Sequence, residues 1–206
     1  MKPIFTQNQL FTFLLFCNGQ GLEKTILDCG AGGKRPPLGI FADHGYATTG
    51  IEIDDEAIEH AKAFEEEHGM DLNISKGDMR ALPYEDESFS YVYSYNTIFH
   101  MSKEEINKAI GEINRVLKPG GICFVNFLTT KDFRAEMGEK IAEGEYLQKE
   151  RGGLILHSYH EEDEPEKYFE NHGLKVGYKE TRVRMVPAPN GGTVTLGLVD
   201  YIVEKI

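Results

Sequence analysis

Short apolar runs alternate with amphipathic stretches along the first two-thirds of this 206-residue chain. A short apolar run closed by glycine or acidic residues predicts a buried strand, whereas apolar residues at helical spacing predict a helix. We therefore expect strands at residues 25–29, 47–53, 71–75, 89–95 and 122–128. We expect helices at residues 5–16, 36–45, 55–68 and 103–117. Strands and helices that alternate over short connections predict a parallel sheet covered on both faces.

The last third of the chain departs from this alternation. Residues 131–151 are charged and weakly periodic, and we expect a helical insertion there. Residues 165–172 predict a helix, followed by the strand-like segments 174–184 and 193–204, which a loop rich in proline and glycine joins. Without a crossover helix between them, these two strands must lie antiparallel. The predicted fold class is α/β, a doubly wound seven-stranded, mostly parallel sheet with an antiparallel C-terminal hairpin strand.

Composition and charge indicate a folded protein with its own core. Hydrophobic residues make up 40% of the chain and aromatic residues 11%, too apolar for a disordered chain. No apolar run approaches the roughly 18 residues of a membrane helix, and the pattern of a signal peptide is absent. We therefore expect a cytoplasmic protein. The net charge of −12, with no long basic run, argues against nucleic acid as a partner.

The three cysteines, Cys17, Cys29 and Cys123, are scattered along the chain. Their odd number argues against a disulfide framework, and their spacing is not that of a structural zinc site. We expect reduced thiols in the core.

A glycine-rich turn follows the first predicted strand at residues 28–33 (DCGAGG). Glycine lets the backbone approach a ligand closely and adopt torsions that other residues avoid. Such a turn alone is weak evidence, but Glu52 lies about 20 residues further on, at the end of the second strand, where a carboxylate can accept hydrogen bonds from both ribose hydroxyls of a nucleotide-like cofactor. The alternative for Glu52 is a solvated charge at the strand end.

The residues after the glycines argue against two kinds of phosphate site. A nucleoside-triphosphate loop needs Gly-Lys-Ser/Thr, but Gly33 is followed by Lys34, Arg35 and Pro36, so no hydroxyl is placed to hold magnesium. A dinucleotide site needs a helix N-terminus close behind the glycines, and two prolines intervene here.

Five ordered motifs resemble those of class I S-adenosylmethionine-dependent methyltransferases. They are residues 26–32 (ILDCGAG), 49–54 (TGIEID), 77–83 (GDMRALP), 89–94 (FSYVYS) and 115–121 (RVLKPGG). The similarity runs in register over residues 24–128, and the terminal hairpin agrees with the reversed last strand of the family. One departure is Lys34, which stands where the family often has a third glycine.

The resemblance implies S-adenosylmethionine as the cofactor. The residues implied to bind it are Asp28, Gly30, Ala31, Gly32, Glu52, Ile53, Gly77, Asp78, Met79, Ser94, Tyr95 and Asn96. The glycine-loop backbone would pack against the methionine part, and Asp28 would approach its amino group. Glu52 would hold the ribose with Ile53 against the adenine, while Asp78 would accept from the adenine amine beside Met79. The last three residues of the set would face the methionine end and the acceptor. Capping, turn formation and core packing are the alternative roles of Asp28, Asp78 and Met79, in that order.

Methyl transfer from a sulfonium depends on alignment and exclusion of water, and a base matters only where the acceptor must lose a proton. His100, just after the fourth strand, is the candidate base, and Tyr159 is a candidate for acceptor contact. His157 and His160 are spaced to share one side of a helical turn. No third ligand accompanies them, so we predict no metal site.

We predict one methyltransferase domain over residues 1–206. Within it we expect an N-terminal helical cap at 1–21, a cofactor-binding core at 24–128, an acceptor-side insertion at 131–164, and a C-terminal helix and hairpin at 165–206.

A small-molecule acceptor is favoured because the insertions are short and the chain is acidic. Residues 94–97 (SYNT) lack the prolines found in methyltransferases that act on DNA bases or protein glutamine. Two alternatives stay open. One is a protein that binds the cofactor without turnover, and the other is a nicotinamide-dependent oxidoreductase, which the terminal hairpin disfavours.

Overall fold

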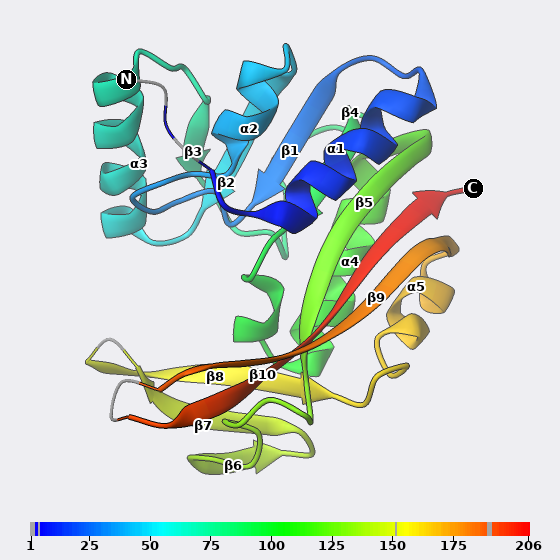
Figure 1. The fold of residues 1–206 in the computed structure, drawn as a ribbon. Helices are drawn as coiled ribbons and strands as arrows, with labels where there is room; N and C mark the ends of the chain where they lie inside the picture. Colours follow the sequence, from blue (N-terminus) through cyan, green and yellow to red (C-terminus); the bar gives the residue numbers. More distant parts are fainter. Residues whose placement is uncertain (1–2, 4, 151, 189–190) are drawn as a thin grey trace.

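A mixed β-sheet forms the centre of the protein, and helices cover both of its faces (Figure 1). The computed structural model describes residues 3, 5–150, 152–188 and 191–206. Its strands are β1 (Thr25–Cys29), β2 (Ala47–Glu52), β3 (Ile74–Lys76), β4 (Phe89–Ser94), β5 (Leu117–Thr129), β6 (Glu139–Ala142), β7 (Glu145–Glu150), β8 (Gly153–His160), β9 (Leu174–Pro187) and β10 (Thr193–Lys205). Its helices are α1 (Asn8–Gln20), α2 (Leu38–Asp43), α3 (Asp55–His68), the 3₁₀ helix η1 (Ile98–His100), α4 (Lys103–Val116) and α5 (Glu166–Asn171).

Seven strands form the sheet that the sequence predicts. They lie in the order β3-β2-β1-β4-β5-β10-β9, and the first five run parallel. Strand β10 lies antiparallel between β5 and β9, so the fold class and the antiparallel hairpin are confirmed. Two residues of the loop between β9 and β10, at 189–190, lie outside the described residues. Strand order reverses between β1 and β4, and ligands of open α/β sheets bind at the carboxyl ends of the strands beside such a point.

The helical insertion expected at residues 131–151 is wrong, because the described residues of this segment form turns and two strands. Strands β6, β7 and β8 form an antiparallel meander, which joins the main sheet where Leu128 and Thr129 of β5 pair in parallel with the end of β8. The described sheet therefore has ten strands instead of seven. Gly138 and Gly144 flank β6, both with the positive φ that favours glycine, and so turn the chain where a helix would continue.

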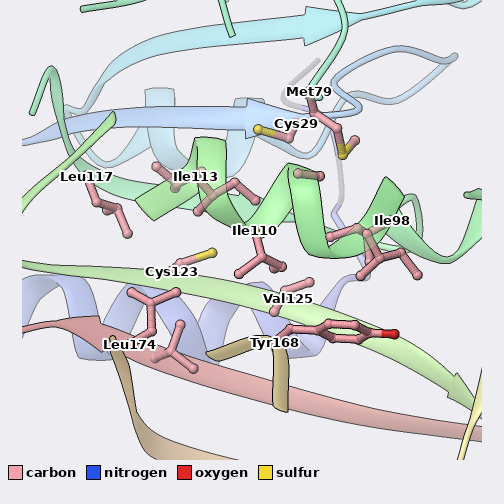
Figure 2. Close-up of a cluster of buried hydrophobic side chains, with 14 of the residues drawn as sticks. Cys29, Met79, Ile98, Ile110, Ile113, Leu117, Cys123, Val125, Tyr168 and Leu174 are labelled. Atoms are coloured by element: carbon pink, nitrogen blue, oxygen red, sulfur yellow. The ribbon is translucent and has the colours of Figure 1, made fainter. Parts of the chain in front are cut away.

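The two faces of the sheet have separate apolar layers. Neighbouring residues of β1 point to opposite faces, so Ile26 packs with α1, α2 and α3, whereas Leu27 packs with α4 and α5. Figure 2 shows the second layer, in which Ile110 of α4 lies beside Cys123 and Val125 of β5. Because both faces of the sheet are buried, the carboxyl ends of its strands, which carry the site, are held in place.

The cysteines occupy these layers as the sequence predicts. Cys17, Cys29 and Cys123 are free of disulfide bonds and fully buried, and burial raises the pKa of each thiol well above its ordinary value. No helix among the described residues is both long enough and apolar enough to cross a bilayer.

Helix α4 begins at a capping box that also borders the site. The Ser102 hydroxyl accepts from the Glu105 backbone N–H at 3.2 Å, and Glu105 Oε2 accepts from the Ser102 backbone N–H at 3.0 Å. Replacing Ser102 by alanine is expected to lower the free energy of unfolding by about 1 kcal/mol, because it leaves a helix N–H without its partner. Urea unfolding would measure the loss. A Ser102→Thr variant keeps the hydroxyl, and an equal loss in that variant would contradict the role of the cap.

Candidate active site

A pocket opens at the carboxyl ends of β1 and β2. It encloses about 610 Å³, counting its open mouth. We call it the strand-end pocket. Six of the residues predicted from the sequence to bind a cofactor line it, namely Gly30, Glu52, Ile53, Gly77, Asp78 and Met79.

Gly30 of the glycine loop lines this pocket, and neither Gly30 nor Gly32 leaves room for a larger residue. Gly30 has φ +107°, and a Cβ there would lie 2.5 Å from the Thr97 side chain. A Cβ on Gly32 would lie 2.6 Å from the Ala57 Cβ and 2.8 Å from a carboxylate oxygen of Glu52. Gly30 is therefore required both by its positive φ and by its close contact, whereas Gly32 is required by its close contact alone.

Glu52 turns its carboxylate toward the glycine loop. Its Oε2 accepts from the Gly32 N–H at 3.1 Å, and its Oε1 accepts from the N–H groups of Ile53 at 2.8 Å and Asp54 at 3.0 Å. An ionised carboxylate has about four acceptor positions, so capacity for a further donor is left on Oε2. The end of β2 thus holds a fixed anionic acceptor at the pocket wall. This geometry disfavours the alternative that Glu52 is only a solvated charge at the strand end.

An ion-pair network also lines the strand-end pocket. Asp78 accepts from Arg80 Nε at 2.9 Å and Nη2 at 2.7 Å, and these hydrogen bonds lower the pKa of the Asp78 carboxyl. Arg80 also pairs with Glu105. Arg80, Glu105, Thr97 and Met101 line the pocket and were not predicted from the sequence. Two of these four residues had a signal in the sequence. Arg80 lies inside the third motif, and Glu105 belongs to a capping box.

Four of the residues predicted to bind the cofactor do not line the strand-end pocket or the second pocket described below, namely Asp28, Ala31, Gly32 and Ser94. Ala31 is fully buried in the core, and the backbone N–H of Gly32 is bonded to Glu52. Asp28 is buried beneath the loop, where burial raises the pKa of its carboxyl well above the ordinary value and the nearby Tyr93 hydroxyl opposes part of that shift. The buried Asp28 Oδ2 and Ser94 Oγ have no hydrogen-bond partner among the described residues, so both retain capacity for a ligand or water.

A second pocket adjoins the first and is lined by residues of η1, β5, β7, β9 and β10 and of the segments that directly follow β4 and β5. We call it the arginine pocket because Arg134, Arg182 and Arg184 line it, and it encloses about 690 Å³. The predicted residues Tyr95 and Asn96 lie here instead of in the strand-end pocket. Arg134 comes from the turn after β5, whereas Arg182 and Arg184 both come from β9, and sequence analysis did not identify any of the three.

His100 is the one described residue that lines both pockets. Its ring lies 4.6 Å from that of His157, centroid to centroid, in an edge-to-face arrangement. Although the residue is exposed, desolvation by the groups packed against its ring and the neighbouring His157 lower the pKa of His100 to about 4, against the opposing charge of Glu150 and a hydrogen bond to the Leu156 backbone. At neutral pH the His100 imidazole is therefore uncharged and able to accept a proton.

His157 and His160 do not share a helical turn, because both belong to strand β8. His157 Nε2 lies 3.3 Å from Glu150 Oε2, whereas His160 Nε2 lies 3.0 Å from the Tyr168 hydroxyl. Within the described chain no three acidic, histidine or cysteine side chains are grouped to hold a metal ion. Tyr159 lines neither pocket and donates its hydroxyl to Gln148 Oε1 at 3.0 Å, so this geometry favours a packing role.

The comparisons with known proteins agree with this geometry. Residues 27–125 match the family model described as a methyltransferase domain. The chain is 35% identical over 103 residues to the sterol 24-C-methyltransferase of Pneumocystis carinii (strain B80), covering 48% of this chain and 26% of that protein. It is 34% identical over 125 residues to 24-methylenesterol C-methyltransferase 2 of Arabidopsis thaliana, covering 57% of this chain and 33% of that protein. The chain thus spans a third or less of the length of these two relatives.

A solved structure supports the fold over nearly the whole chain. A methyltransferase of Methanosarcina mazei, described as SAM-dependent, aligns with a TM-score of 0.75 and 23% identity over 93% of this chain and 97% of that one.

The sheet order, the glycine loop and the strand-end carboxylate define an α/β protein of the cofactor-binding, doubly wound class. The match of residues 27–125 to the methyltransferase-domain model, the ordered motifs and the fold all agree with the class I S-adenosylmethionine-dependent methyltransferases. The resemblance found in the sequence is confirmed, and S-adenosylmethionine is the cofactor of this family.

Proposed function

We propose that this protein transfers the methyl group of S-adenosylmethionine to a small-molecule acceptor. The observation that carries the proposal is that His100 joins two adjoining pockets, one suited to the cofactor and the other available to an acceptor. The relatives named above are sterol methyltransferases, which supports a small molecule as the acceptor. The cytoplasmic location and the absence of a nucleic-acid partner stay predictions from the sequence.

The residues of the strand-end pocket fit the cofactor. Gly30 brings the loop backbone to the pocket without a side chain in the way, and Glu52 retains acceptor capacity for one ribose hydroxyl. Asp78 would accept from the adenine amine while remaining paired with Arg80. Ile53, 58% exposed beside the pocket, would cover one face of the ring. When bound, S-adenosylmethionine supplies an electrophilic methyl group on its sulfonium.

The chain's own contribution to the reaction is alignment, exclusion of water and acceptance of a proton. His100 would take the proton that the accepting atom loses, since its neutral imidazole lies between the two pockets. Tyr95 and Asn96 would border the path between cofactor and acceptor. Tyr159 would support this wall through its bond to Gln148.

Calorimetry and a transfer assay test the proposal separately. S-adenosylhomocysteine, the demethylated product, is expected to bind the folded protein with micromolar or tighter affinity, as typical cofactor sites do. Label from methyl-labelled S-adenosylmethionine is expected to move to a member of a metabolite panel. Failure of the folded protein to bind would overturn the methyltransferase proposal. Binding without transfer to any acceptor would instead favour the alternative of a protein that binds without turnover.

A further inference from the structure

The arginine pocket places two arginines on one face of a strand. Arg182 and Arg184 of β9 are two residues apart, so their side chains leave the strand on the same side. Arg134 reaches the same pocket from the turn after β5. Three guanidinium groups around one cavity form an unusual concentration of cations in a chain with a net charge of −12.

Two of these arginines are held in place by buried carboxylates. Arg182 Nη2 donates to Asp200 Oδ1 at 2.7 Å and its Nε donates to Oδ2, while only 9% of its side chain and 1% of that of Asp200 are exposed. Arg134 Nε donates to Asp132 Oδ1 at 3.0 Å, and the Asp132 side chain is fully buried. A guanidinium carries five N–H donors, so the remaining donors of each arginine are fixed in orientation and available to a ligand.

Arg184 forms no direct ion pair with a described residue, although its charge acts on Asp200. Its side chain is exposed at the pocket, and among the described residues it has no hydrogen-bonded or ion-paired partner. The carboxylate of Glu150 also lines the pocket, where it lies beside His157. Asp132 and Asp200 are committed to the other two arginines, so Arg184 remains available to an anion from solution.

Apolar side chains line the rest of the cavity. Phe99, Leu128, Leu196 and Leu198 come from η1, β5 and β10, and all four belong to or pack against one apolar cluster. A ligand that fits both parts of the lining has an apolar body and an oxyanion, because arginine pairs with the two oxygens of a carboxylate or phosphate in a fixed geometry. A neutral sterol would leave these donors without an acceptor.

We infer that the arginine pocket selects an acceptor with an apolar body and an anionic group, a carboxylate or a phosphate, which Arg184 and the held guanidinium of Arg182 bind. This inference rests on the proposed function, since it takes the arginine pocket as the acceptor side of His100. The cofactor also carries a carboxylate, on its methionine part. The experiment must therefore distinguish an acceptor anion from the anion of the cofactor.

The test uses the full chain saturated with S-adenosylhomocysteine, which already carries the cofactor carboxylate. Benzoate, phenylpropionate, octanoate and phenyl phosphate are titrated against it calorimetrically, alongside the neutral amides of the three acids and phenol. At least one anion is expected to bind roughly tenfold or more tightly than its neutral counterpart. An Arg184→Gln variant is expected to remove that preference while keeping the affinity for S-adenosylhomocysteine.

A Lys175→Gln variant is the matched control, because Lys175 is an exposed cation on the same strand outside both pockets. Its preference for anions is expected to stay at the wild-type value. The inference is overturned if no anion binds better than its neutral counterpart, or if both variants lose the preference equally. It is also overturned if Arg184→Gln weakens S-adenosylhomocysteine and leaves anion binding unchanged. Because no arm requires turnover, the inference can fail while the methyltransferase proposal stands.

Discussion

A His100→Gln variant is expected to lower kcat by a factor of about 10² to 10⁴ while keeping the affinity for S-adenosylhomocysteine. His100 lies between the strand-end pocket and the arginine pocket, where the accepting atom and the methyl group must meet. Glutamine is similar in size and polarity but cannot take up the proton. Steady-state kinetics with an acceptor from the label-transfer panel would measure the change in kcat, and calorimetry would measure the cofactor affinity.

The pH dependence of the same reaction provides a second readout. Local desolvation of its ring and the neighbouring His157 lower the pKa of His100 to about 4, so its imidazole stays neutral well below pH 6.5. The acidic limb of kcat/KM is therefore expected near pH 4 and is expected to be absent in His100→Gln. The same shift makes the folded protein lose stability as the pH falls from 6.5 toward 4, because the unfolded chain binds the proton first. Circular dichroism at each pH would identify the range in which the protein is folded.

A His60→Gln variant is the control for these measurements, because His60 lies on α3 and lines neither pocket. It is expected to behave as the wild type. An unchanged kcat in His100→Gln, or an acidic limb that persists in that variant, would contradict the assignment of His100 as the base.

Glu52→Gln is expected to weaken S-adenosylhomocysteine binding by about 10- to 100-fold, because it replaces charge-assisted hydrogen bonds to the ribose with weaker ones. The side chain keeps its size, and its oxygen can still accept from the Gly32 N–H, although the amide NH2 no longer accepts from Ile53 and Asp54. Ile53 and Asp54 are exposed, so water can accept from their N–H groups and the fold is expected to survive. Calorimetric titration would measure the affinity, and thermal unfolding without ligand would show that the protein remains folded.

Glu56→Gln is the matched control, since Glu56 is exposed in the first turn of α3 and does not line the strand-end pocket. Its affinity for S-adenosylhomocysteine is expected to equal that of the wild type. If Glu52→Gln binds S-adenosylhomocysteine with wild-type affinity, this carboxylate does not hold the ribose, and the proposed placement of the cofactor is wrong.

The core of the sheet was predictable because its signals are local. A buried parallel strand is a short apolar run, and the helix between two such strands shows its period within a few turns. Helix α3 begins and ends at the predicted residues, with Asp54 as its N-cap and Gly69 as its C-cap. Glu52 and the glycine loop could be placed together from the sequence, since both follow neighbouring parallel strands and therefore lie at one edge.

The meander and the arginine pocket were not predictable in this way. Strands β6 and β7 carry exposed charges, and their sequences lack an apolar period that would distinguish a strand from a helix. The arginine pocket combines Arg134 with Arg182 across about 50 residues of chain, and only the folded sheet brings them together. The spacing of Arg182 and Arg184 along a predicted strand was the single local signal of a shared face.

The burial of Cys17, Cys29 and Cys123 makes the native protein a convenient background for chemical labelling. Thiol reagents attack the thiolate, which these inaccessible side chains with raised pKa values do not present. A cysteine introduced at the exposed position Glu139 of β6 would then react with a maleimide dye alone. A fluorophore attached there would report on movements of the meander beside the arginine pocket without removal of any native cysteine.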